Sequence, residues 1–94
     1  MSAEKMIRIS AVFYGFVQGV GFRYSASHAA SLLGLTGWVR NEFDGSVSAE
    51  IQGDRDKIQE WIKIISSRRF IDISNIDCKE IDLDPEERDF QVRY

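Results

Sequence analysis

Hydrophobic and polar positions in the first third of the chain predict a strand, a loop and a helix. From Ile7 to Phe13 every second residue is apolar and points to the core, which is typical of a strand with one buried face. Gly15 is expected to end this strand. Apolar residues then recur at helical spacing over residues 22–33, and Gly34 supplies a stop for the predicted helix.

The middle of the chain predicts a hairpin followed by a second helix. Residues 36–41 and 47–52 have the composition of strands, and Asp44-Gly45 between them is a strong turn signal. Gly53 is expected to end the second of these strands, and Asp54 is a candidate N-cap for the helix that follows. The predicted buried face of that helix consists of Ile58, Trp61, Ile62 and Ile65.

Two further strands are predicted near the carboxyl end, over residues 76–83 and 90–94, with Pro85 between them. The order β-α-β-β-α-β plus a short terminal strand predicts the α+β class. The expected architecture is a ferredoxin-like split βαβ sandwich, with an antiparallel sheet and two helices on one face. We expect residues 1–94 to form a single domain in which residues 1–5 are flexible.

Composition and charge narrow the classes of function. The net charge of −3, with 12 basic and 15 acidic residues, argues against a basic face for nucleic acid. No apolar run is long enough for a membrane span. The single cysteine, Cys78, allows no internal disulfide, and His28 is the only histidine, so neither a metal site nor a Cys/His nucleophile is expected. We therefore expect a cytoplasmic protein without a metal site, and the role of Cys78 stays open.

The segment between the first strand and the first helix has the chemistry of an anion-binding loop. Glycines at 15, 19 and 21 lack a Cβ and let successive amides turn inward, while a helix start presents unsatisfied N–H groups. The segment is not a Walker loop, because no Gly-Lys-Ser/Thr follows. It is not a dinucleotide fingerprint either, because Tyr24 stands where the third glycine would be.

Arg23 strengthens this interpretation. A cation near a helix N-terminus opposes the helix dipole by about 0.3–1 kcal/mol, unless a bound anion reverses the effect. A phosphoryl group would accept a forked pair of hydrogen bonds from the guanidinium. The alternative is a merely tight loop in which Arg23 pairs with a surface carboxylate, and the loop and Arg23 alone leave both interpretations open.

Asn41 is a second candidate, at the end of the strand that precedes the Asp44-Gly45 turn. In the expected topology this strand end approaches the first loop, so the carboxamide could orient a water molecule. An asparagine before a turn also has an ordinary structural role, which competes with the functional one.

Together these segments resemble the acylphosphatase family, small enzymes that hydrolyse carboxyl-phosphate bonds on a ferredoxin-like fold. Gly15-Phe16-Val17-Gln18-Gly19-Val20-Gly21-Phe22-Arg23 resembles the first signature of the family, and Gly37-Trp38-Val39-Arg40-Asn41 resembles the second. The resemblance covers residues 6–94. It differs in two places, because Gly53-Asp54 stands where many relatives have Gly-Pro and residues 66–70 lack a Gly/Pro-rich turn.

The resemblance implies a role for each matching residue. Arg23 would bind the substrate phosphoryl group, and Asn41 would position the attacking water. Backbone amides of the loop would hold the remaining phosphoryl oxygens, and the residues concerned are Val17, Gln18, Gly19, Val20, Gly21 and Phe22. The implied substrate is a small acyl phosphate, the implied product inorganic phosphate, and neither a metal nor a covalent intermediate is implied. With this resemblance we expect a monomeric enzyme that needs no cofactor.

Two alternatives remain from other classes of protein. A non-catalytic module could keep the loop to sense phosphate or a phosphorylated metabolite. RNA binding on the open sheet face is a third interpretation, disfavoured because residues 46–52 place no aromatic side chain on that face of their strand.

Overall fold

The computed structural model describes residues 5–94, and its elements follow one another in the predicted order. Residues 1–5 are predicted to be flexible, and residues 1–4 of this segment lie outside the described part of the chain. The elements are β1 (Met6–Phe16), α1 (Phe22–Leu33), β2 (Thr36–Asn41), β3 (Val47–Asp54), α2 (Arg55–Ser66), β4 (Asp72–Ile81) and β5 (Phe90–Arg93).

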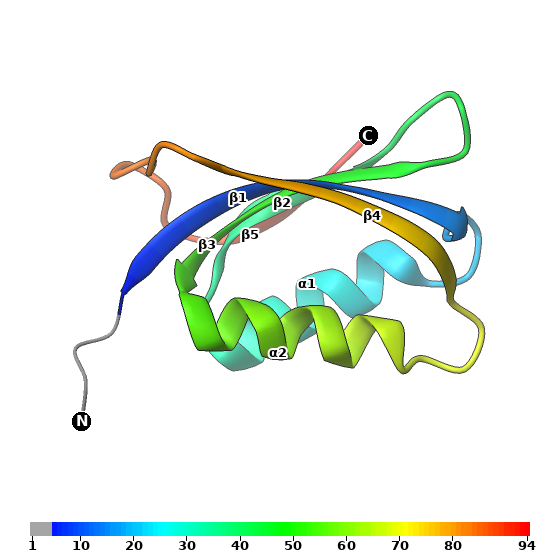
Figure 1. Cartoon of the computed structure of the whole chain (residues 1–94), viewed down its shortest axis with the longest axis horizontal. Helices are drawn as coiled ribbons and strands as arrows, with labels where there is room; N and C mark the ends of the chain where they lie inside the picture. The colour runs from blue at the N-terminus through cyan, green and yellow to red at the C-terminus, as the bar shows by residue number, and fades with distance from the viewer. Residues whose placement is uncertain (1–4) are drawn as a thin grey trace.

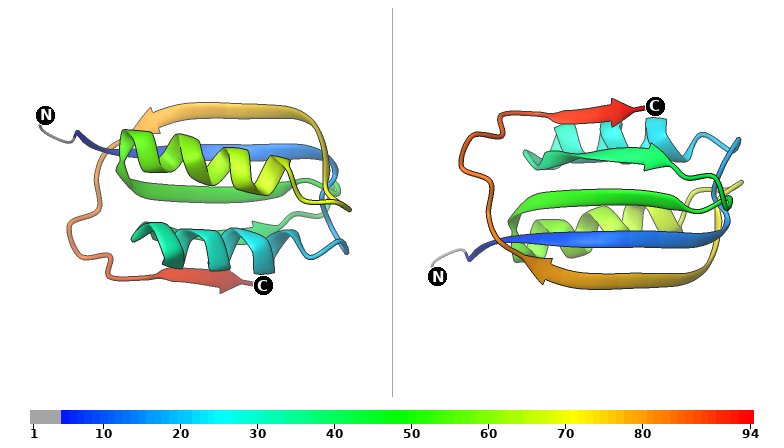
Figure 2. Two further views of the ribbon diagram at one scale, coloured as in Figure 1. Left: turned by 90° about the horizontal axis from the view of Figure 1, so that it is seen from below. Right: turned by 90° about the horizontal axis from the view of Figure 1, so that it is seen from above.

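The five strands form one sheet in the order β4-β1-β3-β2-β5. Both helices pack on one face of this sheet and leave the opposite face uncovered (Figure 1). The predicted α+β ferredoxin-like class is confirmed. Four strands pair antiparallel, whereas β5 runs parallel to β2, so the sheet is mixed rather than wholly antiparallel. The reason is the connection 82–89, which crosses one end of the sheet and enters β5 from the end at which β2 begins (Figure 2).

Aromatic side chains fill the core between the helices and the sheet. Phe13 of β1 packs against Phe22 of α1 and Trp61 of α2, with ring centroids 5.0 and 6.0 Å apart. The Trp61 indole N–H donates a hydrogen bond of 2.9 Å to the carbonyl of Ala26. This bond satisfies a fully buried donor and ties α2 to α1. The start of α1 is thereby held against the end of β1, which fixes the loop between them.

Three predicted strand boundaries were wrong. β1 continues through Gly15 to Phe16, because both residues pair with β4 in the ladder. β3 continues through Gly53 to Asp54, because Gly53 pairs with Ile7 in the ladder and its missing Cβ leaves room for the Leu35 side chain. β4 spans 72–81 rather than the predicted 76–83. It is an edge strand with mostly exposed side chains, so its pairing with β1 fixes its position without a clear alternation in sequence. The predicted N-cap is confirmed, since the Asp54 carboxylate accepts a hydrogen bond from the Asp56 amide.

The two tryptophans have different environments. Trp61 is fully buried, as expected of a packing residue. Trp38 is only half-buried in β2, and its ring lies 5.2 Å from the Arg40 guanidinium and 4.8 Å from that of Arg93. The expectation that both tryptophans are simple packing residues therefore holds for Trp61 alone.

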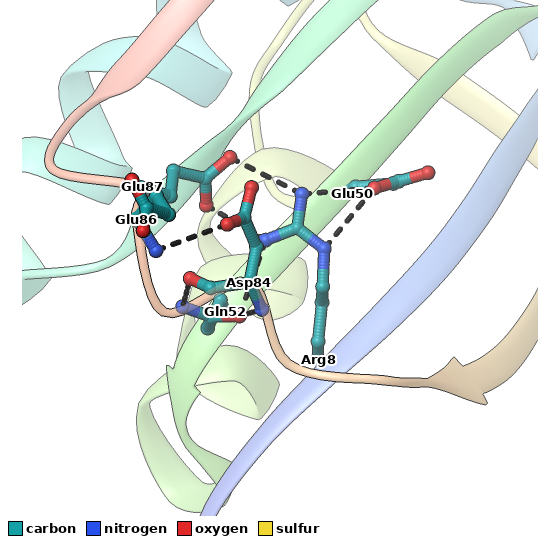
Figure 3. A network of polar contacts seen from close by, with 6 residues as sticks. All are labelled: Arg8, Glu50, Gln52, Asp84, Glu86 and Glu87. Carbon is teal, nitrogen blue, oxygen red and sulfur yellow. Dashed lines mark hydrogen bonds and ion pairs between the residues drawn. The ribbon is translucent and has the colours of Figure 1, made fainter.

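A buried arginine fastens the connection 82–89 to the sheet (Figure 3). Arg8 of β1 lies 2.7 Å from the Glu87 carboxylate in that connection and 2.8 Å from the Glu50 carboxylate of β3. Gln52 of β3 adds a second attachment, because its side chain donates to the carbonyl of Asp84 and accepts from the Asp84 amide. The connection is thus held by a charge-assisted network before it reaches β5.

Replacing Arg8 with alanine is expected to lower the free energy of unfolding by about 2–3 kcal/mol, because two partly buried carboxylates lose their common cation. Urea denaturation followed by circular dichroism measures this loss. Arg88 is exposed and lies in the same connection, so Arg88→Ala is the matched control and should change little. Equal losses in the two variants would contradict a stabilising role for the network.

The described part of the chain offers no helix with the length and apolar character that crossing a membrane requires.

Candidate active site

A cavity of about 360 Å³ lies where the β1–α1 loop, the end of β2 and the end of β5 meet. Six of the predicted site residues line it: Val17, Gly19, Gly21, Phe22, Arg23 and Asn41. Residues of both predicted signatures therefore line one cavity, although α1 and β2 separate them in the sequence. Tyr24, Val92 and Tyr94 complete the lining. Gln18 and Val20, also predicted, do not line the cavity.

The loop owes its path to two glycines in left-handed backbone conformations. Gly19 has φ 74° and Gly21 has φ 80°, values that other residues rarely adopt. A Cβ at either position would meet no neighbouring atom within 4 Å, so conformation rather than crowding requires glycine here. Substitution of either glycine would strain the loop that forms one wall of the cavity.

The two helices differ at their N-termini. α2 is capped by the Asp54 side chain and has Asp56 in its first turn. α1 starts after Gly21, with no side-chain cap and no acidic residue in its first turn. The positive end of the α1 dipole is therefore not compensated by a side chain of its own first turn. Phe22 and Arg23 of this turn line the cavity, which places the positive end beside it.

The loop amides have no hydrogen-bond acceptors in the part of the chain that the structure describes. Among residues 5–94, no oxygen accepts a hydrogen bond from the backbone N–H groups of residues 17–22. Six consecutive donors beside an uncapped helix start make a site suited to an anion with several oxygens. The alternative of a loop whose amides are already bonded internally does not fit this arrangement.

Arg23 lies in the cavity wall and is held there by the last strand. Its Nη1 donates a hydrogen bond of 3.3 Å to the carbonyl of Arg93, and its guanidinium carbon lies 4.8 Å from the centroid of the Tyr94 ring. Within residues 5–94 no carboxylate lies within ion-pair distance of Arg23. The alternative in which Arg23 pairs with a surface carboxylate therefore does not apply, and most of its N–H donors stay available to a ligand.

Asn41 reaches the same cavity from the last position of β2. Its side chain is half-buried, and no group in residues 5–94 forms a hydrogen bond with its carboxamide. The neighbouring turn is instead organised by Asp44, which accepts hydrogen bonds from the amide and hydroxyl of Ser46 at 2.9 and 2.6 Å. An ordinary turn role for Asn41 is therefore not what the structure describes.

Gln18 fastens the loop to the β2–β3 turn. Its side-chain Nε2 donates to the carbonyls of Glu42 at 2.7 Å and Ser46 at 2.8 Å. Its side chain thus positions the loop relative to Asn41. The sequence pattern placed Gln18 in the loop but gave no sign of this contact.

Gln18→Ala is expected to lower the free energy of unfolding by about 1–3 kcal/mol, since two part-buried carbonyls lose their donor. Chemical denaturation gives this difference directly. Gln59 is an exposed glutamine on α2, and Gln59→Ala should leave stability almost unchanged. If Gln18→Ala were as stable as Gln59→Ala, the proposed attachment of the loop would be wrong.

The turn has a carboxylate with a lowered pKa. Hydrogen bonds from the Ser46 hydroxyl and amide hold the pKa of Asp44 below its ordinary value of 3.8. Because the folded pKa is lowered, this contribution to stability is present above the unfolded pKa and is lost as pH falls through the folded value. A carbon-detected NMR titration should give an Asp44 pKa below 3.8. A value at or above 3.8 would contradict the turn geometry.

Other candidate chemical groups lie apart from the cavity. His28 stacks on Tyr24, and its ring is exposed. Cys78 lies on β4, where burial raises the pKa of its thiol, which disfavours the reactive thiolate. Within residues 5–94, no group of three or more His, Cys, Asp or Glu side chains is arranged to hold a metal ion.

The contribution of β5 is the part of the site that sequence reasoning missed. Val92, Tyr94 and the carbonyl of Arg93 all reach the cavity or Arg23. The alternation of residues 90–94 predicted a strand, but only its parallel pairing with β2 places that strand beside Arg23.

Comparison with known proteins agrees with the fold. The family model described as Acylphosphatase matches residues 9–92. The chain is 38% identical over 90 residues to an acylphosphatase of Geobacillus thermodenitrificans, covering 95% of this chain and 96% of that protein. It is 42% identical over 88 residues to one of Clostridium perfringens, covering 93% and 99%.

The solved structure of an acylphosphatase from Coxiella burnetii has the same fold, with a TM-score of 0.86 and 33% identity. That alignment covers 99% of this chain and 100% of the other. The family model, the full-length relatives and this structural agreement all support one assignment. The chain therefore belongs to the acylphosphatase family.

Proposed function

We propose that this chain hydrolyses the carboxyl-phosphate bond of small acyl phosphates by direct attack of water on phosphorus. The bond between phosphorus and the carboxylate oxygen breaks, and a new bond between phosphorus and the water oxygen forms. The products are a carboxylate and inorganic phosphate. The observation that carries this proposal is the run of unbonded amides of residues 17–22 in the loop that, together with Arg23, forms one wall of the cavity.

Binding of the phosphoryl group is assigned to the loop and Arg23. In a loose transition state, negative charge lies on the three equatorial phosphoryl oxygens. The loop amides and the guanidinium are already positioned around the cavity, so they stabilise this charge without rearrangement. The Arg93 carbonyl and the Tyr94 ring restrict Arg23, which reduces the entropy lost when it binds an anion.

Positioning of the nucleophile is assigned to Asn41. Its carboxamide has both an acceptor oxygen and donor hydrogens, so it can accept a hydrogen bond from water and direct the water lone pair toward phosphorus. Fixing a water in line with the breaking bond reduces the entropic part of the barrier. The free carboxamide of Asn41 at the cavity wall supports this assignment.

The leaving group needs no proton from the protein. A carboxylic acid has a pKa of about 4, so the carboxylate departs at neutral pH without protonation. The proton of the attacking water is assigned to a phosphoryl oxygen, since no side chain with the properties of a general base lines the cavity. All the groups named belong to one chain, so the proposed reaction needs no residue from a second subunit.

Hydrolysis of benzoyl phosphate in ¹⁸O-water tests the proposal. Attack at phosphorus places the label in inorganic phosphate, and attack at the carbonyl carbon would place it in benzoate. Mass spectrometry of both products is expected to find enzyme-dependent label in phosphate only. Label in benzoate would refute the mechanism. Tight phosphate binding with no turnover would instead support the non-catalytic module.

A further inference from the structure

The rim of the cavity carries more exposed aromatic surface than phosphate binding needs. Tyr24 and Tyr94 line the cavity although their side chains are 72% and 95% exposed. Phe43 is also fully exposed, and with Tyr94 it lines a second cavity of about 460 Å³. Asn41 and Tyr94 belong to both cavities, so the cavities adjoin one another at these two residues.

We propose that Tyr24 is the platform for the acyl group of the substrate, and that the site favours acyl phosphates with an aromatic or large apolar acyl group. The inference rests on the proposed function. It assigns the binding role to Tyr24, which lines the first cavity, rather than to Phe43, which lines only the second. The third exposed ring, Tyr94, already contacts the Arg23 guanidinium.

The geometry of in-line displacement favours Tyr24 over Phe43 as the ring that contacts the acyl group. The entering water and the departing carboxylate lie on opposite sides of phosphorus. If Asn41 holds the water, the second cavity, which Asn41 shares with Phe43, lies on the entering side. Tyr24 is not part of that second cavity. The acyl group therefore departs away from Phe43.

The two rings also belong to different layers of the fold. Asn41 and Phe43 lie at the end of β2 and in the turn after it, whereas Tyr24 lies in the first turn of α1. The helix layer and the sheet layer are separate in edge view, with α1 starting below the end of β2 (Figure 1). Tyr24 and Asn41 line the same cavity from different elements, α1 and β2, so the acyl group that leaves on the side away from Asn41 is assigned to Tyr24.

Tyr24 is held in place despite its exposure. Its ring stacks on His28 one helical turn later, with centroids 5.8 Å apart and planes 7° from parallel. A ring fixed in this way offers its other face to a flat apolar group with little further loss of freedom. A small acyl group such as acetyl would gain little from this contact, so discrimination should grow with the apolar area of the acyl group.

The test is the ratio of kcat/KM for benzoyl phosphate to kcat/KM for acetyl phosphate. Tyr24→Ala is expected to lower this ratio about threefold to tenfold relative to the unmodified chain. Tyr24→Phe keeps the ring and should keep the ratio. Phe43→Ala removes the exposed ring on the other side and should also keep the ratio.

An unchanged ratio in Tyr24→Ala, or a ratio that falls in Phe43→Ala instead, would overturn the inference. Failure of the proposed function would look different, because the unmodified chain would then hydrolyse neither substrate. Circular dichroism and the inhibition constant of inorganic phosphate show whether each variant is folded with an intact phosphoryl site. A change in both substrates by the same factor would also count against the platform.

Discussion

Arg23→Ala is expected to lower kcat/KM for benzoyl phosphate by at least about a thousandfold, in the range that a transition-state arginine contributes to phosphoryl transfer. The guanidinium is the only cationic side chain in the cavity lining, and within residues 5–94 it makes no ion pair. Its removal takes away charge-assisted hydrogen bonds from both bound substrate and transition state. Inhibition by inorganic phosphate should therefore weaken together with catalysis.

The fold should tolerate this change. Arg23 contributes one long, exposed hydrogen bond to Arg93 and a contact with the exposed Tyr94 ring. Arg69→Ala is the matched control, because Arg69 also stacks on an exposed ring, Phe70, at 5.5 Å but lies outside the cavity. Steady-state kinetics and thermal unfolding of both variants make the comparison. An Arg23→Ala variant as active as Arg69→Ala would refute the assignment.

Asn41→Ala is expected to lower kcat by about 10²–10³-fold while phosphate inhibition changes little, because the carboxamide acts on water and not on the bound anion. This pattern differs from that of Arg23→Ala, in which binding and catalysis fall together. Single-turnover kinetics with benzoyl phosphate measure the chemical step directly.

Asn75 supplies the control for this second variant. It is an exposed asparagine on β4, and its side chain donates a 3.3 Å hydrogen bond to Asp77, outside the cavity. Asn75→Ala should keep full activity. If Asn41→Ala lost phosphate binding as strongly as catalysis, Asn41 would be a ligand of the phosphoryl group rather than of the water.

Local patterns predicted most of the fold because local chemistry determines it. The helical spacing in α1 and α2, the Gly34 stop and the Asp54 cap each depend on residues within a few positions of one another. β4 was misplaced by four residues at its start because its edge position leaves both faces polar. The parallel direction of β5 depends on where the connection 82–89 is fastened, and the Arg8 network that fastens it joins residues far apart in sequence.

The candidate site likewise has features that the sequence predicted and contacts that it did not. The glycines, the uncapped helix start and Arg23 are contiguous in sequence, so an anion-binding loop could be inferred from them directly. The proximity of Asn41 followed from the expected topology and is what the structure describes. The contacts of Gln18 with the β2–β3 turn and of Arg23 with Arg93 and Tyr94 could not be inferred, because they link separate elements.

A titration of the ¹⁵N-labelled chain with inorganic phosphate, followed by amide NMR, tests the central assignment most directly. We expect saturable shifts concentrated on the amides of residues 17–22 and on the Arg23 side chain. The capped N-terminus of α2 at Asp54 serves as an internal comparison and should not respond. Saturable shifts located elsewhere, with the loop amides unmoved, would contradict the account.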